Sequence, residues 1–546
     1  MNEKKFTLTL FDTTGIQEYI FGSNQLAQNI GASELVELAT GPWLVQNLES
    51  LGFSHNMKWS PSKGMEYNGS KVGNVDVEAI YAGGGNAVLI FAPLKDAKKF
   101  IRSHSRYVLK NARGLQLQTV FQAFEWTESI SDVLSNLRKE AFSQKMKRPA
   151  STPLPGLSVT ASCVYTGLPA TGRSIEDVFP ALANTHDSER LNRVNQQRPI
   201  SKEVADKLQA EPEAKERLHD ILVQARSTGY EFVYDFDQFG DKGTSSYIAV
   251  VHTDGNGMGK RFDQIAEDCK TADKNDEYVK RLRELSTSVR AQADKALKET
   301  LAYLIDGLKR GQIEIAIHKL GGIPLLPFRP IVFGGDDVTF VCDGRLGLQL
   351  ANIYLKAFTD GKLVDGDAVF ARAGVAVVKT HFPFSRAYNL AEDLARNAKE
   401  AIKDLKEETE PSATVMDWHF STTGVIRTLH DLRQKEYRAK INQSMLLRPI
   451  RVNSQPGVWR TWETLEAAVK GFKNKDWSAK RNKLKDLQSA LRGGSDEVKV
   501  FLKNYRIEDL PKIPAQPGLE KTGWLNNTTC GYFDALEALD FVEIKP

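Results

Sequence analysis

Four consecutive residues, Gly334-Gly335-Asp336-Asp337, stand between the apolar runs RPIVF and VTFVC and carry the strongest chemical signal of the chain. Glycines permit a tight hairpin turn and a close approach of the backbone to a ligand. Two neighbouring carboxylates repel each other unless a cation lies between them, and oxygen ligands suit Mg²⁺ or Mn²⁺. A solvated turn that merely uses Asp for its loop propensity is the alternative interpretation. The pattern favours a divalent-metal site that also holds phosphates.

A third carboxylate, Asp254, ends the apolar run YIAVVHTD. In a βαββ unit this strand lies beside the hairpin, so we expect three carboxylates at one sheet edge. Two metals about 4 Å apart there could activate a hydroxyl and neutralise the charge on an attacked phosphate. The following Gly255-Asn256-Gly257 would let the backbone wrap a triphosphate before a helix N-terminus, where free N–H groups favour anions. Taken alone, it could also be a plain strand-to-helix turn.

The elements that must position these residues occur twice along the chain. Residues 5–11 alternate apolar and polar side chains and predict a strand that ends at Asp12. Helical segments, two strands joined at Gly83-Gly84-Gly85, a helix, a strand and a further helix follow, up to about residue 147. This order is the split βαβ pattern of a ferredoxin-like unit.

The second block repeats this order, and its hairpin FGGDDVTFV corresponds to AGGGNAVLIF in the first. Between the blocks the chain is polar and opens with RPASTPLPGLS, which is typical of an inserted, largely helical connector. The C-terminal part is helical and rich in Lys and Arg. We therefore predict an α+β protein with two ferredoxin-like domains, a helical insertion between them and a C-terminal helical bundle, over residues 1–147, 242–420, 148–241 and 421–546, respectively.

The composition limits the classes of protein to which this chain can belong. Of the 546 residues, 41% are hydrophobic and 26% charged, which is ordinary for a soluble protein with several cores. A net charge of +4 permits contact with nucleotides or nucleic acid but lacks the massed charge of a protein held on DNA by phosphate neutralisation alone. The four cysteines form no C-x-x-C pair, which argues against a disulfide framework and favours the cytoplasm. The sequence shows neither a secretion signal nor a membrane span.

Several motifs in a fixed order resemble those of a known family. They are FDTTGIQEYIF with GASEL, AGGGNAVLIF, HTDGNGMGK, FGGDDVTF, ARAGVAVVKTHFP and AEDLARNAKEAIK. With this ordered set the chain resembles the large palm-domain polymerase/cyclase subunit of type III CRISPR effector complexes. The resemblance covers nearly all of the chain up to about residue 420 and, more loosely, the part beyond.

This resemblance implies two palm domains that face each other with ATP bound between them. The palm with the two aspartates would use two divalent metals, Mg²⁺ or Mn²⁺, to join ATP by 3′–5′ linkages into cyclic oligoadenylate second messengers. The resemblance also implies cytoplasmic antiviral defence, CRISPR effector subunits as partners, and binding of guide and target RNA, with target RNA as the trigger of synthesis.

The same resemblance suggests the site residues. Asp254, Asp336 and Asp337 would be the catalytic residues and the metal ligands. Lys399 would contact the triphosphate, or it is a solvated helix lysine. Ser33 and the glycine turn of the first palm would help to hold a second nucleotide. The expected nucleotide-binding set is Ser33, Gly84, Gly85, Asn86, Gly255, Asn256, Gly334, Gly335 and Lys399.

The chain also departs from the family pattern. Many members begin with an HD nuclease domain, whereas the palm here begins at about residue 5, so we expect a short form without that activity. Cys163 begins a segment that looks like the relic of a zinc knuckle, with Thr166 where a second cysteine would stand. We therefore expect no structural zinc.

The two palms differ at their turns. The first palm keeps Asp12 but has Gly85-Asn86 where the second has Asp336-Asp337. We expect the first palm to bind nucleotide without catalysing. Three other functions compete with the RNA-triggered synthase: a stand-alone cyclic-nucleotide synthase in antiphage signalling, a scaffold subunit that organises a ribonucleoprotein without catalysis, and a diguanylate-cyclase-like enzyme. The intact set of three carboxylates argues against the scaffold, and the presence of both palms in one chain argues against the diguanylate cyclase.

Overall fold

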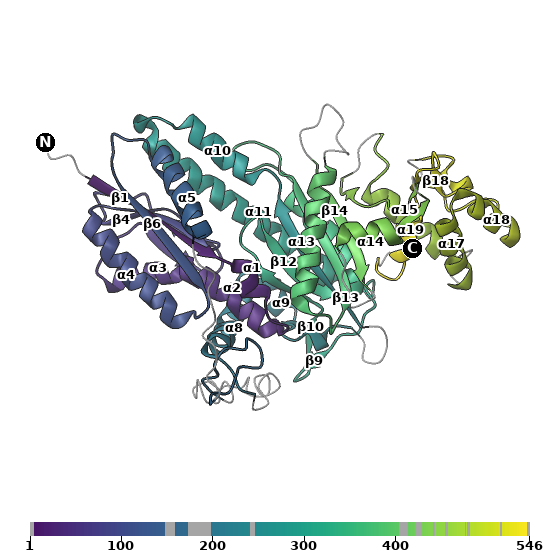
Figure 1. Ribbon diagram of the computed structural model, residues 1–546, viewed down its shortest axis with the longest axis horizontal. Coiled ribbons are helices and arrows are strands. Elements are labelled where there is room, and N and C mark those ends of the chain that lie inside the picture. Colours follow the sequence, from purple (N-terminus) through teal and green to yellow (C-terminus); the bar gives the residue numbers. More distant parts are fainter. Residues whose placement is uncertain are drawn as a thin grey trace. The chain divides into compact units, whose positions relative to one another are not determined.

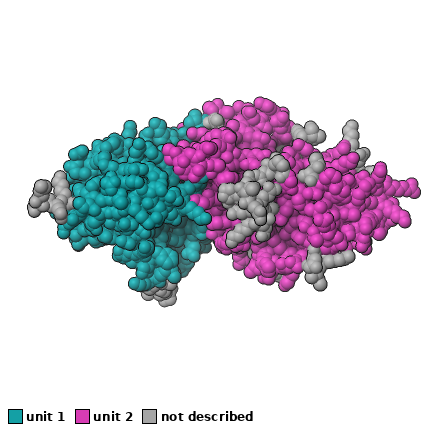
Figure 2. All heavy atoms as spheres, turned by 90° about the horizontal axis from the view of Figure 1, so that it is seen from above, with its two compact units in different colours: residues 1–223, 258–290 teal, residues 224–257, 291–546 magenta. Residues whose placement is uncertain are grey.

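The computed structural model describes residues 5–147, 159–172, 198–240, 246–402, 413–421, 428–440, 443–453, 457–474, 477, 481–513 and 516–542. The chain forms two compact units that are not contiguous in sequence (Figure 2). The first unit comprises Met1–Val223 and Met258–Arg290, and the second comprises Gln224–Gly257 and Ala291–Pro546. Within the described residues, no helix has both the length and the apolar character needed to cross a membrane.

The first unit is built on a four-stranded antiparallel sheet in the order β4-β5-β1-β6 (Figure 1). Its strands are β1 (Lys5–Thr14), β4 (Val77–Gly83), β5 (Asn86–Phe91) and β6 (Gln116–Glu125). A hairpin beside the first strand, with the last strand on the other side, is the ferredoxin-like arrangement. Strand β1 runs two residues past Asp12, which the sequence placed at its end.

The helices of the first unit follow the apolar spacing of the sequence. Helix α4 buries Ala97, Phe100, His104 and Val108, which recur every three or four residues. The run at 24–50 is divided, because Gly41 and Pro42 separate α2 from α3. The helices are α1 (Ile16–Phe21), α2 (Leu26–Thr40), α3 (Pro42–Ser50), α4 (Leu94–Asn111), α5 (Ile130–Lys147), α8 (Lys202–Ile221) and α10 (Met258–Asp268), with a small hairpin of β2 (Met57–Ser60) and β3 (Gly64–Tyr67).

The second unit repeats this strand order and extends it. Its six-stranded sheet has the order β11-β12-β8-β13-β14-β17, in which the first four strands correspond to β4-β5-β1-β6. Strand β14 is parallel to β13, and the other pairs are antiparallel. The strands are β8 (Tyr247–Gly255), β11 (Phe328–Val332), β12 (Val338–Asp343), β13 (Ala371–Lys379), β14 (Val415–Ser421) and β17 (Ile450–Arg451).

Helix α13 (Phe384–Ala401) lies against β13, at a distance set by one glycine. A Cβ atom at Gly374 would come within 1.9 Å of the Ala391 carbonyl oxygen, so only glycine allows the helix to approach this closely. Two helices, α9 (Val223–Ser227) and α11 (Asn275–Lys309), each contain a point in the sequence where the chain passes from one unit to the other. The remaining elements of the second unit before its C-terminal part are α12 (Gly347–Phe358), β7 (Glu231–Phe232), β9 (Lys319–Leu320) and β10 (Ile323–Leu326).

The C-terminal part of the second unit contains the predicted helices and, in addition, a small sheet. The helices are α14 (Leu429–Glu436), α15 (Trp462–Lys473), α17 (Arg481–Gly493), α18 (Ser495–Tyr505) and α19 (Phe533–Glu537). The sheet joins β15 (Arg438–Lys440), β16 (Gln443–Ser444), β19 (Thr529–Cys530) and β18 (Trp524–Leu525). Strands of two or three residues are too short to show an alternating pattern. The predicted α+β class with two ferredoxin-like sheets is confirmed.

Candidate active site

The three predicted metal ligands meet at one edge of the second sheet. Asp254 is the penultimate residue of β8, and Thr253 pairs with Val338, the first residue of β12. Asp336 and Asp337 immediately precede Val338, so the turn at 334–337 ends beside Asp254. The strand register alone therefore brings together carboxylates that are more than eighty residues apart in the sequence.

These carboxylates lie in a strongly unfavourable electrostatic environment. Withdrawal from water and the nearby Asp254 carboxylate raise the pKa of Asp336 to about 6, against the opposing effect of Arg372. The same two causes, together with Glu392, raise the pKa of Asp337 to about 7. Half of the Asp337 side chain is exposed (50%), so solvent screens part of the repulsion that it experiences. The raised pKa values of Asp336 and Asp337 thus reflect burial first and then repulsion among the carboxylates, which Arg372 only partly offsets.

Arg372 supplies a counter-charge to Asp254. It lies on β13 as the register partner of Asp254, and its Nη2 donates a short hydrogen bond to Asp254 Oδ2. Its Nη1 donates to Asn256 Oδ1 at 2.8 Å. The guanidinium thus bridges the end of β8 and the loop that follows it.

His252 lies behind the turn on the same face of β8 as Asp254. Its Nδ1 is 3.4 Å from Asp337 Oδ1 and 3.2 Å from Thr339 Oγ1. Burial lowers the pKa of His252, although Asp254 and Glu392 oppose this effect. The neutral ring packs edge-on against Tyr388 of α13, with 5.5 Å between the ring centroids. His252 therefore supports Asp337 without adding positive charge.

Gly334, Gly255 and Asn256 each have a structural role beside the carboxylates of the second unit. Gly334 has φ 102°, a conformation that favours glycine, and it opens the turn. Asn256 donates its backbone N–H to the Phe370 carbonyl at 2.8 Å and its Nδ2 to the Ala413 carbonyl at 3.2 Å. Gly255 closes β8. Asn256 is thus a fixed anchor beside the carboxylates.

Lys399 lies in the last turn of α13 and is exposed. It is two helical turns beyond Glu392, on the same side of the helix. Glu392 acts electrostatically on Asp337, so this side of α13 faces the carboxylate edge at that level. The structure gives Lys399 no contact with the carboxylates themselves, and its role at a triphosphate stays a prediction.

The carboxylates fit a divalent metal by donor type. Three carboxylates with shared, poorly compensated negative charge are the hard oxygen ligands that Mg²⁺ and Mn²⁺ prefer. Across the described ranges, however, no three acidic, histidine or cysteine side chains are arranged as a ready-made metal site. Asp254 is instead engaged by Arg372. A metal at this edge would therefore compete with Arg372 for Asp254.

The glycine turn of the first unit at 83–86 is engaged by its own chain. The Gly84 N–H donates to Glu37 Oε2 at 3.1 Å, and the Gly85 N–H donates to Thr40 Oγ1 at 3.0 Å. Both acceptors belong to helix α2. Gly85 has φ 90°, and a Cβ atom there would lie 2.7 Å from Thr13 Oγ1. This turn is satisfied internally and closely packed.

Glu37 belongs to a buried charge cluster. Its Oε1 lies 3.3 Å from Arg290 Nη1. Although burial opposes them, the Arg217 and Arg290 charges and the Gly84 hydrogen bond lower the pKa of Glu37. Glu34, one turn earlier on α2, accepts from Arg217 Nε at 2.8 Å. The turn at 83–86 is therefore hydrogen-bonded to an ionised carboxylate, that of Glu37.

The other predicted residues of the first unit lie around this turn. Ser33 is buried on α2, one turn before Glu37. Asn86 is exposed and is the register partner of Asp12. The Asp12 carboxylate pairs with Lys145 Nζ at 2.5 Å. In the first unit, the aspartate on the central strand thus has a lysine as counter-ion.

Sequence reasoning missed Arg372, His252, Glu37 and Thr40 as parts of these sites. Arg372 stands in the quoted motif ARAGVAVV, yet nothing in the motif shows that it faces Asp254. A signal did exist for α2, because Ser33, Glu37 and Thr40 recur at intervals of four and three residues and therefore share one helix face.

Hydrogen bonds hold the segment that begins at Cys163 in a compact turn. The Cys163 N–H donates to the Leu168 carbonyl at 2.7 Å, and the Gly167 N–H donates to the Cys163 carbonyl at 2.9 Å. Thr166 Oγ1 lies 3.2 Å from Ser201 Oγ. Although burial opposes it, hydrogen bonds from Thr166 and nearby backbone groups lower the pKa of the Cys163 thiol. One thiol and two hydroxyls do not fit a thiolate-bound zinc ion.

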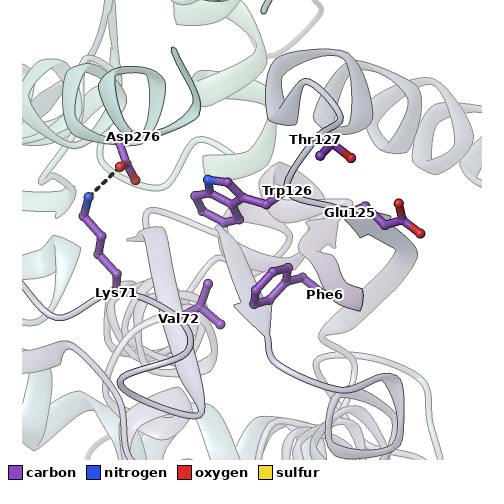
Figure 3. A pocket seen from close by; sticks show the side chains of 7 residues that line it. All are labelled: Phe6, Lys71, Val72, Glu125, Trp126, Thr127 and Asp276. Carbon is purple, nitrogen blue, oxygen red and sulfur yellow. Dashed lines mark hydrogen bonds and ion pairs between the residues drawn. The ribbon is translucent and has the colours of Figure 1, made fainter. Parts of the chain in front are cut away.

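A surface pocket of about 420 Å³ lies elsewhere on the first unit (Figure 3). The Trp126 indole and the Phe6 ring form its apolar part, and Lys71 and Asp276 pair at 2.6 Å at its rim. None of the predicted site residues lines it. The chemistry indicated by the sequence therefore belongs to the carboxylate edge and not to this pocket.

Residues 247–406 match the family model of the Cas10/Cmr2 second palm domain. The matched segment contains β8, the turn at 334–337, β13 and α13, and thus every residue of the carboxylate edge described above. No curated protein matches the chain. The family resemblance drawn from the motifs is confirmed for this second palm.

Two solved structures are similar over nearly the whole chain. A chain in the crystal structure of the apo Csm1–Csm4 cassette has a TM-score of 0.52, at 13% identity, over 99% of this chain and 70% of that one. A chain in the cassette complex with AMPPNP has a TM-score of 0.51, with the same identity and coverage. At this identity the likeness establishes the fold alone.

Proposed function

We propose that this protein is a nucleotidyltransferase that joins ATP into cyclic oligoadenylates at the carboxylate edge of the second palm. The observation that carries the proposal is the meeting of Asp254, Asp336 and Asp337 at one sheet edge, with the pKa of Asp336 raised to about 6 and that of Asp337 to about 7. Such negative charge is costly in a protein that has no use for a cation there.

The chain's own residues would divide the work. Asp254, Asp336 and Asp337 would hold two divalent metals, which supply activation of a 3′-hydroxyl and charge neutralisation at the attacked α-phosphate. Gly334 and Gly335 would keep the turn narrow enough for phosphate oxygens to approach its backbone. Gly255 and Asn256 precede α10, whose first N–H groups favour anions. Lys399 would meet the triphosphate from α13.

The first palm would hold the acceptor nucleotide without metal. Its turn has Gly85-Asn86 in place of aspartates, and the Glu37 carboxylate already occupies the Gly84 N–H. Ser33 and Asn86 would contribute side-chain contacts to this nucleotide. We infer that this palm positions a substrate and performs no chemistry, since Gly85 and Asn86 supply no carboxylate at its turn.

The similar structures support a proposal on the class of substrate and partner. One of them contains AMPPNP, an analogue of ATP, and both are Csm1–Csm4 assemblies. We infer that this chain binds ATP, joins further CRISPR effector subunits in the cytoplasm, and is triggered by target RNA paired to guide RNA.

The test is incubation of the purified chain with Mg²⁺ or Mn²⁺ and each nucleoside triphosphate in turn, followed by mass spectrometry of the products. We expect cyclic oligoadenylates from ATP and from no other nucleoside triphosphate, with a rise in yield when the partner subunits and RNA are added. The same assay with the partner subunits and RNA added separates the RNA-triggered enzyme from a stand-alone synthase, because the stand-alone synthase needs neither.

A matched pair of variants locates the activity. D336A/D337A should abolish product, whereas D365A/D367A removes two exposed carboxylates from the loop between α12 and β13 and should leave the yield unchanged. Undiminished synthesis by D336A/D337A would exclude the carboxylate edge. Absence of product from the complete RNA-bound assembly would instead favour the scaffold subunit.

A further inference from the structure

Arg372 is held in one orientation by two partners. One arm of the guanidinium donates to Asp254 Oδ2 and the other to Asn256 Oδ1, and the side chain is 13% exposed. A planar guanidinium binds oxygens in this forked manner with defined geometry. Arg372 is therefore oriented by these two partners and is not a freely moving surface charge.

The two partners of Arg372 differ in how firmly they are fixed. Asn256 is tied by its backbone N–H to Phe370 and by its Nδ2 to Ala413. The Asp254 side chain keeps 28% of its surface exposed, and Asp336 and Asp337 lie beside it. A cation that approaches this edge can therefore compete for Asp254, while Asn256 keeps its hold on Arg372.

The positive charge of Arg372 opposes the binding of a divalent cation to Asp254, and this favours an exchange of partners. In the state described, Arg372 lowers the repulsion among three carboxylates, and no three described acidic groups are arranged to hold a metal. Arg372 and a divalent cation compete for Asp254, since two positive groups at one carboxylate repel each other.

We propose that Arg372 acts as an internal counter-ion of Asp254, leaves it when the metal binds, and then pairs with the triphosphate while Asn256 anchors it. This inference rests on the proposed function, because it assumes that metal and nucleotide meet at the carboxylate edge. The guanidinium thereby moves from a carboxylate to a phosphate, which it binds in the same forked manner.

The exchange makes metal and triphosphate depend on each other. Without nucleotide, the metal must displace a charged hydrogen bond from Asp254, so it binds weakly. With nucleotide, the displaced guanidinium gains a phosphate partner, so the metal binds more tightly. Linkage requires that each ligand raise the affinity for the other by the same factor. Arg372 would thus keep the site free of metal until ATP arrives.

The test is Mn²⁺ binding followed by electron paramagnetic resonance, with and without AMPPNP. R372Q keeps a polar side chain at this position but removes the guanidinium charge and its forked contacts to Asp254 and Asn256. We expect R372Q to bind Mn²⁺ about tenfold more tightly than the wild type without AMPPNP, because a charged hydrogen bond no longer competes. AMPPNP should then add little to its Mn²⁺ affinity, whereas it should raise that of the wild type by about tenfold.

Controls separate this exchange from general electrostatics and from misfolding. R386Q removes an exposed positive charge from the same unit, on α13, and should leave Mn²⁺ affinity unchanged. A damaged site would lose affinity, so an increase in R372Q cannot come from misfolding. Mn²⁺ binding that R372Q leaves unchanged or weakens would overturn the exchange alone. Failure of the wild type to bind Mn²⁺ even with AMPPNP would overturn the proposed function together with it.

Discussion

The two hairpin turns of this protein occupy equivalent places in two sheets of the same strand order, and yet their charges are opposite. The first turn, 83–86, offers backbone N–H groups to the Glu37 carboxylate and the Thr40 hydroxyl. The second turn, 334–337, offers carboxylates whose pKa values are raised, beside a single guanidinium, Arg372. The polar groups of the first turn have hydrogen-bond partners within the chain, whereas the second turn has an excess of negative charge.

This difference shows how one fold can carry a structural and a reactive version of the same turn. In the first, a side chain of the neighbouring helix provides the anion, so the polar groups are satisfied without a ligand. In the second, the side chains of the turn provide the anions, and one arginine cannot neutralise three of them. The same backbone topology therefore yields opposite demands for an external ion.

The largest effect should follow from making the second turn like the first. D336G/D337N reproduces the sequence of the first turn and should lower product formation by about a thousandfold or more, because the metal loses two of its three ligands. Mass spectrometry of the products and Mn²⁺ stoichiometry check this. A double variant that still binds Mn²⁺ as the wild type does would show that the turn is not the metal site.

The reverse exchange should damage the fold and create no second metal site. In G85D the new side chain meets Thr13 and Ile16 at 2.7 and 2.8 Å, in a backbone conformation with φ 90° that suits glycine. We expect a loss of about 3 kcal/mol or more in the free energy of unfolding. Chemical denaturation measures the loss, and N86D, at an exposed position, is the control that should lose little.

A smaller effect is expected from Glu37, the internal anion of the first turn. E37Q keeps the shape of the side chain but removes the charge that Arg290 and Arg217 stabilise. We expect a loss of about 1–3 kcal/mol in the free energy of unfolding, since a buried charged hydrogen bond becomes neutral. Denaturation curves at neutral pH provide the measurement. Mn²⁺ affinity should not change, and a change there would show that the two turns are coupled.

The smallest expected effect is a dependence of stability on pH at the second turn. The folded protein raises the pKa of Asp336 to about 6 and that of Asp337 to about 7, so between about pH 4 and 7 it retains protons that the unfolded chain has released. Rising pH through this window therefore removes stability from the metal-free wild type. D336N/D337N does not titrate and should have a Tm about 2 °C higher at pH 8, a small value because Asp337 is half exposed.

Thermal melts in the presence of a chelator, at intervals from pH 4 to pH 8, test this difference. The gap between D336N/D337N and the wild type should close as the pH falls and both aspartates become protonated. Parallel melting curves across the whole range would contradict the raised pKa values and, with them, the excess of negative charge that distinguishes the second turn.

Much of the fold could be predicted from the sequence, because its determinants are local. Alternating apolar residues in KFTLTLF and YIAVVHTD identify the two central strands, and the apolar spacing of α4 and α13 identifies the helices that cover them. The repeated order of these elements gave both ferredoxin-like sheets, and the motifs gave the family resemblance that the match over 247–406 confirms. The small C-terminal sheet was not predicted, since strands of two or three residues are too short to show an alternating pattern of apolar residues.

The sequence by itself also determined that Asp254, Asp336 and Asp337 would meet, because strand order and register follow from the hairpin and the central strand. Only the tertiary structure decided which charges stand opposite them. Arg372 lies 118 positions from Asp254, and Glu37 lies 47 positions from Gly84. A turn or an apolar period depends on neighbours in the chain, so it can be recognised directly in the sequence. An ion pair depends on the approach of two side chains from separate elements, and this approach is decided only by the packing of the folded chain.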